Sequence, residues 1–254
     1  MIEKTSWYLK VAPSDCAPYA ILVGDPARQS LFAAQMDNVR EVAQDREFKT
    51  ITGIYSGTPI MVVTVGIGAP SAVLTLEELW ELGVKVVVRA GTGMSLGIPL
   101  GDFILAQAAT RNEGTSISYL PVNFPAVPDI DLFHSFFHTL KKEKAPVSSG
   151  VIMTCDGFYT DMFNHSVSGR QPARSARTLM DEYRAYGIIS ADMETSALYI
   201  AGQFLGMKVL TLLVATVDGR EQLMLEAEIR QFKEKELARL ALEGIHQYAL
   251  KVEK

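Results

Sequence analysis

The residues Ala20-Ile21-Leu22-Val23-Gly24-Asp25-Pro26-Ala27-Arg28 join a short apolar run to the start of a helical pattern. The first four of them form the kind of run that becomes a buried strand. Pro26 suits the first turn of a helix, because no hydrogen bond needs its missing N–H there. A strand that leads directly into a helix is the unit from which an α/β fold is built.

The same alternation continues along the chain on both sides of this unit. Further buried strands are expected at residues 60–65, 85–89, 103–106, 150–154 and 209–217. Helices are expected at residues 71–82, 129–142, 173–186, 194–205 and 221–252. Residues 38–44 and 48–55 form an antiparallel meander with the next strand, which follows the turn Ser56-Gly57-Thr58-Pro59. The sequence therefore predicts a single α/β domain over residues 1–254, with three layers and a mixed central sheet.

Composition excludes several classes of protein. The chain has 254 residues, of which 48% are hydrophobic, enough for one large core, and its net charge of -5 argues against a nucleic-acid surface. We expect neither a secretory signal nor a membrane span, because the first residues are polar and the longest apolar run is short. Cys16 and Cys155 lie far apart and match no redox or zinc spacing, which fits a reducing cytoplasm.

Two places along the chain suit an oxyanion. Gly24 and Pro26 expose backbone N–H groups at the positive end of a helix, and Arg28 adds charge there, although an ordinary strand-to-helix turn explains the string equally well. Arg89 ends an otherwise apolar strand, where an unpaired guanidinium is costly. Arg89 must therefore meet a carboxylate or an anionic ligand.

Two apparent motifs are rejected. Gly91-Thr92-Gly93, with Glu113 about 20 residues later, resembles a dinucleotide fingerprint, but residues 94–101 form a loop with proline and glycine instead of the required helix. His134 and His138 have the spacing of a zinc pair, but neither the adjacent glutamate nor a third ligand is present. These histidines are interpreted as helix-surface or packing residues.

Asp192-Met193-Glu194 lies between the apolar pair Ile188-Ile189 and a helix. Carboxylates at a helix start often only complement the helix dipole. Glu194 can also accept hydrogen bonds from two vicinal hydroxyls, and these bonds strengthen as positive charge develops on a ribose. Together with Arg28, Arg46 and Arg89, this string predicts a combined phosphate and sugar site that cuts or makes a nucleoside bond.

These strings, with residues 64–71 and 123–129, resemble the nucleoside phosphorylase family of hexameric purine nucleoside and uridine phosphorylases over nearly the whole chain. The resemblance implies a nucleoside phosphorylase-like fold and a homo-oligomer, at least a dimer and expected to be a hexamer built as a trimer of dimers. It assigns phosphate binding to Gly24, Arg28, Arg89 and Thr92 of one subunit and to Arg46 of a neighbouring one.

The resemblance also assigns ribose binding to Met193 and Glu194. Tyr8 occupies the position where the family has an inter-subunit histidine that faces the ribose 5′-hydroxyl. Three further residues match positions that hold a monovalent cation at the dimer interface of uridine phosphorylases, although a salt-bridged glutamate and a helix-capping serine explain them equally well. These residues are Glu47, Ile67 and Ser71.

The base-binding residues depart from both branches of the family. Phe158 and Tyr159 are expected at the base, but the Gln-x-Arg pair that follows this aromatic in uridine phosphorylases is missing from residues 160–165. Val217-Asp218-Gly219 resembles the string of apicomplexan-type purine nucleoside phosphorylases, whose aspartate donates a proton to purine N7. Asp-Gly is also a common turn pair, so a structural role for Asp218 stays open.

The resulting prediction is a phosphorylase that gives free base and ribose 1-phosphate and prefers purine nucleosides. Arg89, Glu194 and Asp218 are the expected catalytic residues, phosphate is the co-substrate, and no organic cofactor or catalytic metal is expected. Uridine phosphorylase is the alternative. Two further hypotheses are a nucleosidase, which hydrolyses the bond, and a non-catalytic nucleoside-binding protein.

Overall fold

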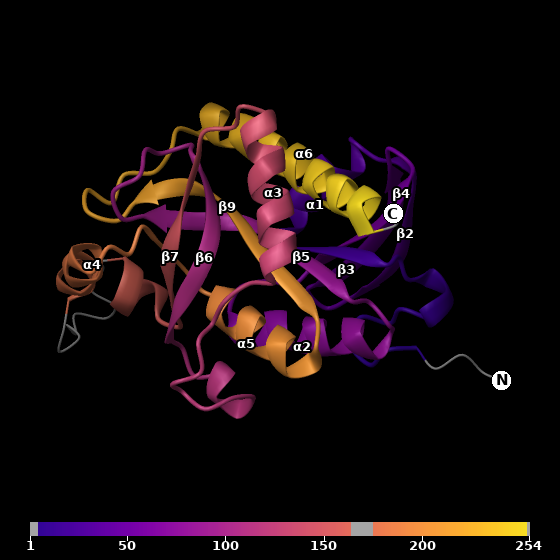
Figure 1. Cartoon of the computed structure of the whole chain (residues 1–254), viewed down its shortest axis with the longest axis horizontal. Coiled ribbons are helices and arrows are strands. Elements are labelled where there is room, and N and C mark those ends of the chain that lie inside the picture. Colours follow the sequence, from indigo (N-terminus) through magenta and orange to yellow (C-terminus); the bar gives the residue numbers. More distant parts are fainter. Residues whose placement is uncertain (1–4, 164–174, 253–254) are drawn as a thin grey trace.

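Nine strands and six α-helices, counted within the described residues 5–163 and 175–252, make up the computed structural model of the chain (Figure 1). The strands are β1 (Tyr19–Val23), β2 (Asp37–Asp45), β3 (Phe48–Tyr55), β4 (Thr58–Thr64), β5 (Val86–Ser95), β6 (Phe103–Asn112), β7 (Val147–Cys155), β8 (Ser190–Asp192) and β9 (Lys208–Asp218). The α-helices are α1 (Pro26–Ala33), α2 (Ala69–Glu81), α3 (Ile130–Lys142), α4 (Ala176–Ala185), α5 (Thr195–Leu205) and α6 (Ala227–Val252). A short π-helical turn, η3 (Phe158–Met162), follows β7.

All nine strands belong to one mixed sheet. Its first half runs β2-β3-β4-β1-β5, in which β2, β3 and β4 form an antiparallel meander and β1 is parallel to both β4 and β5. In its second half, β5, β8, β7, β6 and β9 each pair with the next, and β9 pairs back with β5. This half of the sheet is therefore closed into a ring of strands.

Helices cover both faces of the sheet. On one face α2 and α5 contribute to a core cluster that includes Leu76 and Leu198, and on the other α1, α3 and α6 pack around Phe32, Phe136 and Leu240. Figure 1 shows α3 and α6 on one side of the strands and α2 and α5 on the other. The expected three-layer α/β fold with a mixed central sheet is confirmed; that residues 1–254 form one domain stays a prediction.

The boundaries of several elements differ from the expectation. The strand expected to end at Arg89 continues as β5 through Gly91-Thr92-Gly93 to Ser95, because each of these residues pairs with β9. The helix expected from residue 221 starts at Ala227. The short strand β8 was not expected at all. Residues 164–174, which include the start of the helix expected at residues 173–186, lie outside the described residues.

Among the helices of the described chain, none is both long enough and apolar enough to cross a bilayer.

Candidate active site

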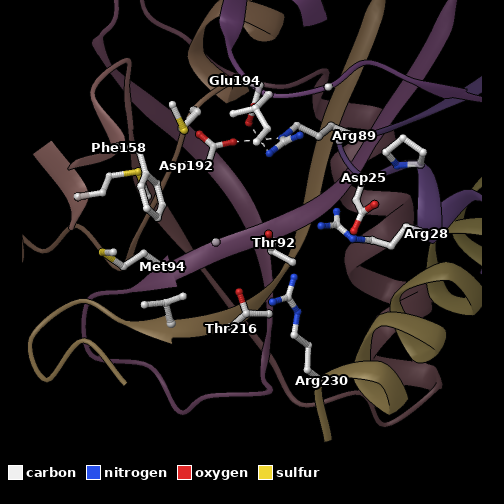
Figure 2. Close-up of a pocket in the computed structure, with 18 of the residues that line it drawn as sticks. Asp25, Arg28, Arg89, Thr92, Met94, Phe158, Asp192, Glu194, Thr216 and Arg230 are labelled. Atoms are coloured by element: carbon white, nitrogen blue, oxygen red, sulfur yellow. Dashed lines mark hydrogen bonds and ion pairs between the residues drawn. The ribbon is translucent and has the colours of Figure 1, made fainter. Parts of the chain in front are cut away.

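A cavity of about 890 Å³ opens where the carboxyl end of β1 and the adjoining segments of β5 and β9 meet the turns that follow β4, β7 and β8 (Figure 2). Its walls carry Gly24, Arg28, Arg89, Thr92, Met193 and Glu194, six residues that the sequence assigns to phosphate and ribose. Strand ends and the turns after them are the usual place for a site in an open α/β sheet. The fold thus brings together residues that are up to 170 positions apart in the sequence.

Arg89 lies at the inner wall of the cavity and contacts two carboxylates. Its Nε donates a hydrogen bond of 3.1 Å to Asp192, and its Nη2 lies 2.5 Å from a carboxylate oxygen of Glu194. All three residues are at most 4% exposed. Burial lowers the pKa of Arg89, but Glu194 and Asp192 reverse that effect, and the net pKa lies above its usual value. Arg89 is therefore a fixed, permanently charged guanidinium.

The two carboxylates are themselves held in place. Asp192 accepts hydrogen bonds from the hydroxyls of Thr154 and Thr195, at 2.8 and 2.6 Å. Glu194 accepts one from the backbone N–H of Gly68 at 2.7 Å, and burial raises its pKa. Asp192 orients Arg89, and both carboxylates line the cavity, where Glu194 has hydrogen-bonding capacity to spare.

The expected phosphate residues surround one end of the cavity. Asp25 caps α1 by accepting the N–H of Ala27 at 2.9 Å, so the backbone between β1 and α1 is fixed. A side chain at Gly24 would lie 3.0 Å from the carbonyl oxygen of Gly66, which explains the glycine. Arg28 is only 7% exposed, and burial lowers its pKa although Glu234 opposes this effect.

Arg46 and Tyr8 do not line this cavity. Arg46 lies in the turn between β2 and β3 with a φ of 51°, and its guanidinium stacks over the ring of Tyr8, 5.5 Å from the ring centre. The Tyr8 ring also contacts Phe48 edge-on. The two residues therefore form an exposed pair, and neither of them lines the cavity, although Glu47, next to Arg46, does.

The other end of the cavity is apolar. Phe158, Tyr159 and Met162 of η3 line it together with Met94 and Val217. Phe158 stacks on Phe163 at 5.6 Å, and Tyr159 meets it edge-on. A planar base fits between such aromatic and thioether side chains. The missing uracil pair falls partly on Asn164 and His165, which lie outside the described residues.

Asp218 is not among the residues that line the cavity. Its carboxylate accepts the backbone N–H groups of Arg220 and Glu221, at 2.9 and 2.7 Å. It borders a separate hollow of about 240 Å³ beside Arg184. This geometry is that of a strand-to-turn residue, the structural role that the sequence left open.

The three expected cation residues lie around the turn between β4 and α2. Ile67 is exposed and lines the cavity together with Glu47, which packs against Gly66. The hydroxyl of Ser71 donates to the carbonyl oxygen of Val65. Glu47 and Ser71 each carry an oxygen of the kind that binds a hard cation, and the Ser71 hydroxyl already donates to Val65.

The rejected motifs have structural explanations. Gly91-Thr92-Gly93 lies within a strand, and a side chain at Gly91 would lie 3.0 Å from the guanidinium of Arg89. His134 and His138 lie on α3, where each ring contacts a phenylalanine edge-on. Over the described chain, no three histidine, cysteine, aspartate or glutamate residues cluster in a way that suits a metal ion.

Two further residues of the cavity wall were not expected from the sequence. Thr216 lies near the end of β9, and Arg230 extends from the first turn of α6 into the cavity (Figure 2). A threonine at the end of an apolar strand is a weak signal of a site. Arg230 lies in a segment rich in charged residues, so nothing in the sequence distinguishes it from a solvent-exposed arginine.

Comparisons with known proteins agree with this geometry. Residues 18–244 match the model of the phosphorylase superfamily. A uridine phosphorylase from Thermococcus kodakarensis is 34% identical over 208 residues, which cover 81% of this chain and 75% of that protein. A guanosine phosphorylase from Halorubrum lacusprofundi is 29% identical, with 84% and 82% covered. The crystal structure of uridine phosphorylase from Vibrio fischeri superposes with a TM-score of 0.84 at 30% identity, covering 95% of this chain and 96% of that one.

Proposed function

This chain belongs to the phosphorylase superfamily and is an enzyme of the pentosyltransferase type, a nucleoside phosphorylase, and we propose that its substrate is uridine. The observation that supports this reaction is the composition of the cavity wall, which contains Arg28, Arg89 and Thr92 together with Glu194. Enzymes of this superfamily use phosphate as co-substrate and no organic cofactor. Phosphate and ribose thus have adjoining places in one cavity.

In the proposed reaction, an oxygen of the bound phosphate attacks C1′ of the nucleoside. The C1′–O bond forms as the C1′–N bond breaks, and the electron pair of the broken bond leaves with the base, which takes up a proton. Arg28 and Arg89 hold the phosphate oxygens, while Glu194 accepts hydrogen bonds from the ribose hydroxyls. The carboxylate also stabilises the positive charge that develops on the ribose in the transition state.

Two observations support uracil over a purine. The relatives include uridine phosphorylases at 34% identity, and Asp218, the residue expected to protonate a purine, lies outside the cavity with its carboxylate engaged by a turn. The purine preference expected from Val217-Asp218-Gly219 therefore has no support. Guanosine is the second candidate, because a guanosine phosphorylase is also among the relatives.

A panel of nucleosides, assayed with and without phosphate, tests this proposal. We expect uridine to be cleaved fastest, only in the presence of phosphate, with ribose 1-phosphate as product. Equal rates in phosphate-free buffer with free ribose as product would indicate a nucleosidase. Faster cleavage of inosine or guanosine would show that the substrate is a purine nucleoside and not uridine. Binding without turnover of any nucleoside would indicate a non-catalytic binding protein.

The assembly is a further part of the proposal. Because Arg46 and Tyr8 do not line the cavity of their own chain, we infer that they complete the cavity of a neighbouring one. We propose a dimer with shared sites, assembled three times into a hexamer, that works in the cytoplasm. A monovalent cation held by Glu47, Ile67 and Ser71 at the dimer interface belongs to the same proposal, and potassium-dependent dimer stability would support it.

A further inference from the structure

The wall of the cavity contains an arginine with no role in the reaction proposed so far. Arg230 lies in the first turn of α6, and its guanidinium points toward Thr92 and Thr216 (Figure 2). The side chain is 40% exposed, and it lines the cavity. A charged side chain in this position meets whatever occupies the space beside Thr92.

Arg230 and Arg28 both contact the carboxylate of Glu234. The Nε of Arg230 donates to Oε1 of Glu234 at 3.0 Å, and the Nε of Arg28 lies 3.5 Å from the same oxygen. The Nε of Arg28 is buried and makes no hydrogen bond within the described chain. Asp25 also lies near Arg28 at this end of the cavity, but its carboxylate caps α1 by accepting the N–H of Ala27. Glu234 is therefore the one carboxylate that pairs with both arginines, and the Nε of Arg28 is left as an unused donor.

Arg89 differs from these two arginines in having two carboxylate partners of its own. Its charge is matched by both Asp192 and Glu194, which lie at the opposite side of the cavity from Arg230 in Figure 2. The free capacity for an anion is therefore greatest between Arg28, Thr92 and Arg230. A guanidinium presents paired N–H donors that match two oxygens of a phosphate.

We propose that Arg230 is a further phosphate-binding residue, which holds inorganic phosphate together with Arg28 and Thr92 of the same chain. This inference rests on the proposed phosphate-dependent reaction and adds a ligand to it. The base is a less suitable target for Arg230, because the apolar end formed by Met94 and Phe158 lies across the cavity (Figure 2). A consequence is that one chain has three arginines for phosphate even without the Arg46 of a partner.

Calorimetric titration with inorganic phosphate tests the proposal directly, without turnover. We expect Arg230→Ala to weaken phosphate binding about tenfold or more, because a charge-assisted hydrogen bond to phosphate is lost. Arg230→Lys should restore part of the loss. Arg239→Ala is the matched control, because Arg239 lies on the same helix and pairs with Glu143 away from the cavity. Thermal unfolding of each variant shows that it is folded.

Steady-state kinetics then distinguish a contact of Arg230 with phosphate from a contact with the base. The KM for phosphate should rise at least tenfold in Arg230→Ala, while the KM for the nucleoside changes less than threefold. Unchanged phosphate binding in Arg230→Ala, or no phosphate binding by the wild type, would overturn the proposal. A rise in the KM for the nucleoside alone would also overturn it, because Arg230 would then contact the base. Phosphate binding that depends on Arg230 in a protein that forms no ribose 1-phosphate would instead refute only the proposed reaction.

Discussion

Arg89 and Glu194 form an ion pair of 2.5 Å inside the cavity, between a residue expected to bind phosphate and a residue expected to bind ribose. Both side chains are about 5% exposed. The pair thus joins the two halves of the site, and the nucleophile and the sugar are positioned by one connected group of charges. A change on either side should affect the binding of both substrates.

The pH dependence of nucleoside binding should follow Glu194. Its pKa is raised by burial, and the ionised carboxylate is a stronger hydrogen-bond acceptor for the ribose hydroxyls than the protonated group. As the pH falls through this raised pKa, kcat/KM for the nucleoside should therefore fall, at a pH above the usual glutamate value of about 4.3. Glu194→Gln should lower kcat/KM about a hundredfold and remove this acidic limb. Glu143→Gln, which changes a surface carboxylate paired with Arg239, should leave the profile unchanged.

Gly91→Ala should reduce activity without unfolding the protein. The added methyl group would lie 3.0 Å from the guanidinium of Arg89, which must then shift away from Asp192 or Glu194. We expect kcat/KM to fall about tenfold or more, because small displacements of a positioning group are costly to the rate. Gly114→Ala is the control, since its methyl group would lie at an ordinary 3.7 Å from Asp156. Similar kinetics for both variants would contradict the prediction.

Asp218→Asn should change uridine cleavage less than threefold. Asparagine keeps the side-chain oxygen that accepts the N–H groups of Arg220 and Glu221, so the turn is preserved. The measurement is kcat/KM for uridine and inosine in the variant and the wild type. A loss of about a hundredfold with inosine would restore Asp218 as the general acid for a purine, and with it the purine preference that the sequence suggested.

Subunit mixing tests whether Arg46 completes the site of a neighbour. Arg46→Ala chains and Glu194→Ala chains should each have little activity, and mixed dimers should regain one intact site after subunit exchange. Activity is measured before and after exchange, which is followed by a mass label on one of the two chains. A fully active monomer, or no recovery after proven exchange, would show that Arg46 is a surface residue stacked on Tyr8.

The sequence predicted those helices and strands that are determined by residues close together along the chain. The strand before Gly24 and the helix after Pro26 follow from local apolar runs and turn residues, and most of the sheet and helix assignments hold for the same reason. The phosphate and ribose residues were identified because each lies in a distinctive string. Their convergence on one cavity agrees with that identification, whereas their roles stay predictions.

What depends on distant pairing was not predictable. The extension of β5 through Gly91-Thr92-Gly93 requires β9 as a partner, and no local pattern predicts that pairing. A glycine-rich segment also usually indicates a turn. Arg230 belongs to the site only because α6 packs its first turn over the cavity. Asp218 is the opposite of Arg230: its sequence motif predicted a site residue, but its carboxylate accepts hydrogen bonds within its own turn.

The ring formed by β5, β8, β7, β6 and β9 also bears on solubility. Among the strands of the described chain, it leaves β2 alone with a single neighbour, so the sheet has one open edge for unwanted strand pairing with other molecules. That edge is irregular, with register shifts on either side of Arg40 and Glu41, and it carries further charges at Asp37 and Asp45. Charge and irregularity at an edge strand discourage edge-to-edge aggregation, which protects the protein at high concentration.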